Sequence, residues 1–121
     1  MNDREYLSPD GQLRLLVLSP DGDLTIGFEG CPAHTHGSIL AELSGCDEET
    51  AATHFVADIV ESKQIIAVWR MSGVLKDAWL PEYEGCSLRD VVADLGRYGE
   101  PGETVEFRLW DGTKVEPTSV R

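Results

Sequence analysis

The segment Gly30–Gly37 concentrates side chains that can do chemistry. Cys31, His34 and His36 lie within six residues of one another, and thiolate and imidazole are natural ligands of zinc. Because the two histidines are two positions apart, an extended backbone projects both to the same side. His54, the remaining histidine of the chain, is a further ligand that the fold could bring close. These four residues are the candidates for a metal site.

Local hydrogen bonding is the interpretation that we favour for this segment. The spacing Cys-x2-His-x-His belongs to no standard zinc finger, zinc ribbon or zincin, and no second cluster of ligands completes it. In this interpretation Thr35 or Ser38 caps a short helical turn over 38–43, and both histidines bond to nearby groups. We therefore assign no cofactor to the chain. Zinc is the cofactor that this segment could hold.

Nucleophilic catalysis is the second chemistry to consider. Asp58 follows His54 at the i+4 position of a predicted helix, where a carboxylate can orient an imidazole, and Cys31 or Cys46 would be the nucleophile. However, the sequence contains no GxSxG, HExxH or other mechanistic signature. We assign no catalytic residue and favour a non-enzymatic function.

Two predicted strands, near 64–71 and 104–110, could present a binding face. Their alternation places Arg70 on one face of the first strand, and Arg108 and Trp110 together on one face of the second. Arginine and tryptophan are enriched at interface hot spots, so these three residues are candidates for partner binding. The alternative is cross-strand packing, in which Arg–Glu and Arg–Trp pairs cover a sheet.

Hydrophobic periodicity predicts the elements that position these groups. Ser-Pro-Asp-Gly occurs at 8–11 and again at 19–22, and each copy is typical of a tight turn. Strands are predicted around these turns, at 5–7, 12–18 and 24–28. The other predicted elements are a helix over 47–63, strands at 64–71 and 74–80 joined by Ser72-Gly73, a helix over 87–95, and a strand at 104–110 followed by a short tail strand.

This order of elements predicts one α+β domain over residues 1–121, with a short flexible tail at about 114–121. We expect an antiparallel or mixed sheet of about five to six strands, with two main helices on one face. The length fits one domain that buries a core of its own.

The net charge of the chain indicates which class of partner it could bind. Twenty-two acidic and ten basic residues give a formal net charge of −12. The basic residues are scattered singly, whereas binding to nucleic acid or to an anionic membrane requires clusters of them. The excess negative charge instead attracts a basic protein, or it simply keeps the chain soluble.

The cysteines and the N-terminus suggest a cytoplasmic location. Three cysteines with no CxxC pair do not suggest a disulfide framework, and residues 1–5 lack the pattern of an export signal. No apolar run approaches the length of a membrane span.

One short pattern resembles a known group of proteins. Ile26-Gly27-Phe28-Glu29-Gly30 followed by His34-Thr35-His36-Gly37, in a small acidic chain, is similar to small bacterial immunity proteins of polymorphic toxin systems. The likeness covers about the first third of the chain. It implies a non-enzymatic protein that binds a cognate toxin and blocks its active site, and it assigns no residue to that role.

The sequence therefore predicts a protein-interaction module, most concretely an immunity-type inhibitor whose acidic surface matches a basic toxin domain. The first alternative is a metal-binding protein or metal-dependent hydrolase that uses Cys31, His34, His36 and His54. The second is a homodimeric adaptor or chaperone. We leave the choice between monomer and homodimer open.

Overall fold

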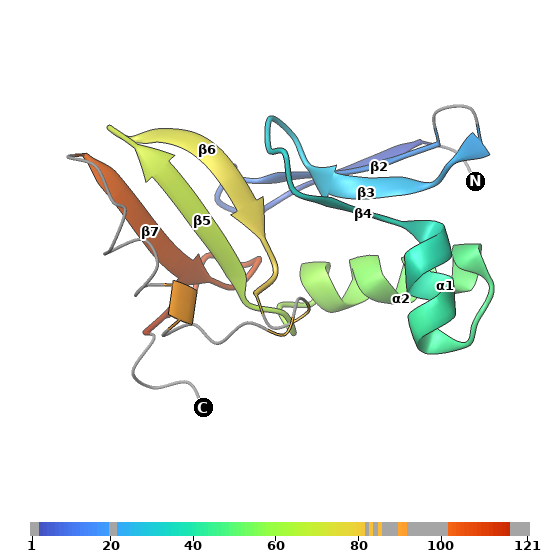
Figure 1. Ribbon diagram of the computed structural model, residues 1–121. Coiled ribbons are helices and arrows are strands. Elements are labelled where there is room, and N and C mark those ends of the chain that lie inside the picture. The colour runs from blue at the N-terminus through green and yellow to red at the C-terminus, as the bar shows by residue number, and fades with distance from the viewer. Residues whose placement is uncertain are drawn as a thin grey trace.

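Two antiparallel sheets and two helices form the part of the chain that the computed structural model describes, residues 3–19, 22–81, 83, 85, 90–91 and 102–116 (Figure 1). The first sheet pairs its strands in chain order: β1 (Arg4–Leu7), β2 (Arg14–Leu18), β3 (Thr25–Phe28) and β4 (His34–His36). The helices follow, α1 (Gly37–Ser44) and α2 (Glu48–Val60). The second sheet has the order β6-β5-β7-β8, with β5 (Ile66–Met71), β6 (Val74–Trp79), β7 (Glu103–Arg108) and β8 (Lys114–Val115). The predicted α+β class is confirmed.

The single sheet of five to six strands that we expected is replaced by these two sheets of four. Short connections fold β1 to β4 into a meander, in which each strand pairs with the one before it. The two helices then intervene, and α2 runs beneath the meander toward β5 (Figure 1). There β5 pairs with β6 through the predicted Ser72-Gly73 turn, whose two residues both have positive φ, and with β7 along its other edge.

The helices begin where local chemistry favours them. Asp47 caps α2 by accepting a hydrogen bond from the backbone N–H of Thr50 at 2.8 Å, and Glu48 and Glu49 place negative charge in the first turn. The helix predicted over 47–63 is thus confirmed. The helix predicted over 87–95 lies outside the described residues except for Asp90 and Val91, which are helical. Neither helix in the described ranges combines the length and the apolar content of a membrane span.

Both sheets contribute to one core. The inner face of the meander, one face of α2 and one face of the second sheet meet there, through buried residues that include Leu15, Ile26, Ile59, Ile66, Val68 and Trp110. The other face of the second sheet is covered as well, by a small cluster around Ala67 and Phe107. Because β5 is buried on both faces, its first residues read as a continuous apolar run rather than an alternation.

An ion pair with one buried partner joins the two sheets. Arg108, at the end of β7, is only 2% exposed and donates to both carboxylate oxygens of Asp10, at 2.7 and 3.1 Å. Asp10 belongs to the first Ser-Pro-Asp-Gly turn, which is closed as predicted by the Gly11 N–H donating to Ser8 O at 2.9 Å. The guanidinium also donates to the carbonyl oxygens of Leu109 and Trp110. The turn after β1 is therefore fixed to a residue 98 positions later in the chain.

We predict that Asp10→Asn lowers the free energy of unfolding near pH 7 by about 2 kcal/mol, because Arg108 is left buried with its charge uncompensated. Asp10 is itself about one-third exposed, so we expect less than the loss for a fully buried pair. Its hydrogen bonds from Arg108 hold the pKa of Asp10 well below the usual range. The ion pair therefore stabilises the fold above about pH 4 and loses its effect as the pH falls toward the folded pKa.

Urea unfolding at several pH values between about 7 and 2 tests this prediction. The natural chain should lose stability more steeply below about pH 4 than Asp10→Asn does. Glu42→Gln, which removes one charge from an exposed helical position, is the control. Equal acid sensitivity of the natural chain and Asp10→Asn would contradict the assigned role of this pair.

Candidate functional site

The two histidines of β4 lie side by side, as the spacing predicts. The imidazole rings of His34 and His36 meet edge to face, with centroids 5.0 Å apart. His34 Nδ1 donates to Pro32 O at 2.9 Å, and His36 Nδ1 lies 3.3 Å from a carboxylate oxygen of Asp23. Local bonding of both rings is confirmed. We expected Thr35 or Ser38 to cap α1. The N-cap residue of α1 is instead His36, and its side chain makes no capping hydrogen bond.

The remaining metal candidates do not join this pair. His54 is exposed on α2, and Cys31 is half-buried with its thiol directed at Glu29 O, 3.7 Å away. Burial, together with the nearby Asp77 carboxylate, raises the pKa of the Cys31 thiol to about 11. A protonated thiol is a poor metal ligand and a poor nucleophile. Within the described ranges, no three His, Cys, Asp or Glu side chains are arranged to hold a metal ion.

The three residues considered for partner binding lie in different environments. Arg108 is buried in the ion pair with Asp10, and Trp110 is only 5% exposed in the main core. Arg70 is partly buried and donates to Glu106 at 2.8 Å. The strand face that we expected to open toward solvent therefore packs against the core, and cross-strand pairing accounts for Arg70.

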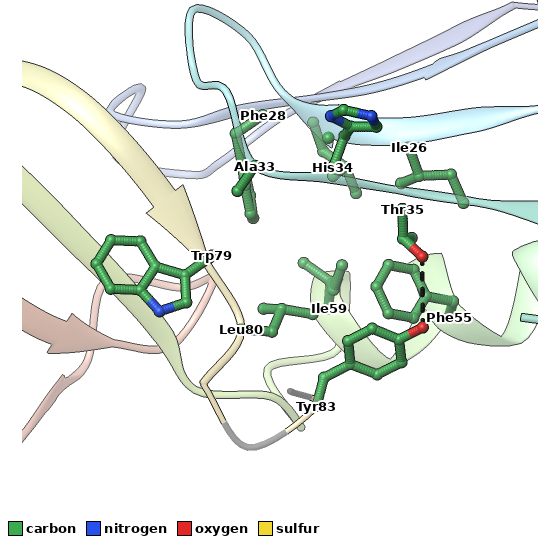
Figure 2. A pocket seen from close by; sticks show the side chains of 12 residues that line it. Ile26, Phe28, Ala33, His34, Thr35, Phe55, Ile59, Trp79, Leu80 and Tyr83 are labelled. Atoms are coloured by element: carbon green, nitrogen blue, oxygen red, sulfur yellow. Dashed lines mark hydrogen bonds between the residues drawn. The ribbon is translucent and has the colours of Figure 1, made fainter. Parts of the chain in front are cut away.

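A small cavity lies where the two sheets and α2 meet (Figure 2). Its volume is about 40 Å³, room for only a few water molecules. At one side Thr35 Oγ1 lies 3.4 Å from the hydroxyl of Tyr83, whose ring packs edge to face on Phe55. The His34 ring points away from the cavity, on the opposite side of β4 from Thr35 (Figure 2). The other lining residues are apolar or nearly so, among them Leu15, Ile26, Phe28, Ile59, Trp79 and Leu80.

The size of this cavity limits what it can do. Pockets that hold small-molecule substrates or cofactors typically have volumes of about 300–1,000 Å³. The cavity between the sheets is several times smaller, and Thr35 and Tyr83 are already in contact with each other at its edge. We therefore interpret it as a packing gap between the two sheets, and we place no substrate there.

The distribution of charge along the chain was missed by the sequence analysis and is the most one-sided feature of the surface. Residues 15–62 contain nine aspartates and glutamates but no lysine or arginine. Four of these carboxylates, Glu42, Asp47, Glu48 and Glu49, are exposed on α1, α2 and their connection, and we call them the acidic helical surface. A count of charges by segment, rather than over the whole chain, would have found it.

Several carboxylates elsewhere in the described structure are matched by cations. Arg14 contacts both Glu5 and Glu29 across the outer face of the meander, and Arg70 and Lys114 both contact Glu106 on the second sheet. None of the ion pairs between described residues involves the acidic helical surface. This surface therefore has a strongly negative potential that the chain itself does not offset within the described ranges.

Comparison with known proteins adds no further evidence. No family model, curated protein or solved structure matches the chain.

We predict that Cys31 reacts with iodoacetamide about 100-fold more slowly than a model cysteine peptide near pH 8, because a thiol with a pKa of about 11 is almost fully protonated there. Timed alkylation of the folded protein, followed by peptide mapping, measures the rate at Cys31 separately from the other cysteines. The rate should keep rising with pH beyond about pH 9. A plateau near pH 9 would show that the thiol has an ordinary pKa.

Proposed function

We propose that this chain is a non-enzymatic protein-interaction module that binds a basic protein through the acidic helical surface. The observation that carries the proposal is the separation of charge, with nine acidic and no basic residues between positions 15 and 62. A one-sign surface accelerates encounter with a partner of opposite charge and disfavours partners of like charge. A surface of this kind can select its partner without a binding pocket.

The structure around this surface supports a binding role. Asp47 is held as a carboxylate, because hydrogen bonds from the backbone N–H and the hydroxyl of Thr50 lower its pKa. The surface lies on helices that pack on the core through Leu40, Ala52, Val56 and Ile59, so it is presented on a rigid element. Rigid presentation limits the loss of conformational entropy on binding.

The most concrete form of the proposal is an immunity-type inhibitor that neutralises a toxin in the cytoplasm. A toxin that cleaves nucleic acid needs a basic active-site face, and an acidic protein of this size can cover such a face. The resemblance of Ile26–Gly30 and His34–Gly37 to immunity proteins agrees with this form. The small cavity is consistent with it, since inhibition by covering a face requires no bound small molecule.

Affinity capture followed by titration tests the proposal. The tagged chain is used to retain proteins from a lysate of its source cells, and the retained protein is identified, purified and titrated by calorimetry at about 50 mM and about 300 mM NaCl. We expect a basic protein that binds at a 1:1 ratio, with a Kd at least about tenfold higher at the higher salt concentration. Retention of no basic protein, or binding that is insensitive to salt, would contradict the proposal.

Paired variants locate the interaction. Glu42→Gln combined with Glu49→Gln should weaken binding about tenfold or more, because both charges lie on the acidic helical surface. Glu5→Gln combined with Glu29→Gln changes the net charge equally but on the outer face of the meander, and should leave the Kd within about twofold. If the partner cleaves nucleic acid, one equivalent of the chain should abolish cleavage. Full cleavage in the complex would exclude the inhibitory role while leaving the binding role intact.

A further inference from the structure

Helix α1 exposes two large apolar side chains next to each other. Leu43 is 70% exposed and Ile39 is 45% exposed. They are four residues apart, so they lie one above the other on the same face of the helix. The neighbouring side of α1 is already used, since Leu40 and Gly37 are buried. The helix is therefore apolar on its inner side, which faces the core, and also on part of its outer side.

This pair differs from the other exposed apolar side chains of the described structure. Leu7, Leu18 and Val74 are also exposed, but each lies on a different strand. Single exposed apolar residues are ordinary in soluble proteins and need no explanation. Two adjacent ones on one helix face form a continuous contact surface, and burying them against a partner would remove apolar area from water.

The acidic helical surface lies on the same helix as this pair and on the residues that follow that helix. Glu42 lies between Ile39 and Leu43 in the sequence and is exposed on the same helix. Glu48 is brought to the start of α1 by packing of the two helices, because a Cβ on Gly37 would lie only 3.0 Å from Glu48 Oε1 and 2.7 Å from Leu24 Cδ2. An apolar centre with a charged rim is the usual anatomy of a protein interface. We call Ile39, Leu43 and the four carboxylates the α1 patch.

The charge of the rim decides which occupant fits. A second copy of this chain would bring four carboxylates against four others in a symmetric contact, and like charges at an interface are strongly unfavourable. A partner with apolar side chains flanked by lysine or arginine satisfies both parts of the patch. The groove near Leu7 has no such preference, because Arg14 and Glu29 on its rim form an ion pair with each other.

We propose that the α1 patch docks an amphipathic basic segment of a partner protein, with Ile39 and Leu43 as the anchoring residues and the carboxylates as the rim. The inference rests on the proposed function and adds the location and the chemistry of the contact. It assigns most of the affinity to two apolar side chains rather than to charge, as is typical of interface hot spots. The carboxylates set the choice of partner and the rate of association.

Two synthetic peptides of equal length and equal charge test this inference. One peptide carries leucines on one helical face and lysines on the other, and its counterpart has alanine at every leucine position. Both are titrated into the full chain at about 50 mM NaCl, with the Kd measured by calorimetry and the contact site located by amide chemical shifts. We expect the Leu/Lys peptide to bind at least about tenfold more tightly and to shift the amides of α1 and the start of α2.

Two matched variants of the chain complete the experiment. Ile39→Ala with Leu43→Ala keeps good helix formers in α1 and should raise the Kd of the Leu/Lys peptide about tenfold, toward that of the Ala/Lys peptide. Leu7→Ala with Val74→Ala removes two exposed apolar side chains elsewhere and should leave the Kd unchanged. Thermal unfolding of both variants verifies that each is folded.

The outcomes separate this inference from the proposed function. Equal and salt-sensitive binding of the two peptides would overturn the apolar anchor and leave charge-driven binding of a basic protein in place. Shifts confined to the second sheet, or an equal loss of affinity in the two variants, would also overturn it. If neither peptide binds at low salt, both the inference and the proposed function are contradicted.

Discussion

The ion pair between Arg108 and Asp10 is the constraint on which the arrangement of the two sheets depends. A guanidinium that is 2% exposed requires an acceptor for nearly every N–H, and here the acceptors are one carboxylate and two carbonyl oxygens. Asp10 can supply its carboxylate only because the Ser-Pro-Asp-Gly turn is held closed and Ser8 Oγ also donates to it at 2.7 Å. The turn after β1 thereby positions the meander against the end of β7.

Much of the local structure could be predicted because it depends on neighbours in sequence. The Asp47 cap, the Ser72-Gly73 hairpin and the Ser-Pro-Asp-Gly turn are each determined by a few adjacent residues. The same is true of the two histidines, whose shared side of β4 follows from their spacing alone. The division into two sheets could not be predicted, because it depends on which strands do not pair with each other. The alternation of apolar and polar residues shows the two faces of a strand but does not identify the strands beside it. The strand His34–His36 was missed for a related reason: it is short and polar, and only its partner β3 defines it.

The candidate site shows the same limit. The strand that we predicted to reach Trp110 ends at Arg108, and Trp110 lies in the turn that follows. Both side chains are buried, which the sequence could not show. Arginine at a buried position is rare enough that exposure was the natural expectation. Conversely, the α1 patch consists of ordinary helix residues, and it is conspicuous only once the exposure of Ile39 and Leu43 is known. What could have been seen beforehand is the run of residues 15–62 without a cation, since that is a property of the sequence itself.

The absence of lysine and arginine from residues 15–62 also protects this part of the chain from reactions that require those side chains. Lysine side chains are the targets of acetylation, methylation and ubiquitin attachment, and residues 15–62 present none. Trypsin, which cleaves after lysine and arginine, has no cleavage site from the residue after Arg14 until Lys63, so the second and third strands, β4 and both helices are released as one fragment even from unfolded protein. A single sequence property therefore makes this half of the molecule negatively charged, and also inert to amine-directed modification and to cleavage at basic residues.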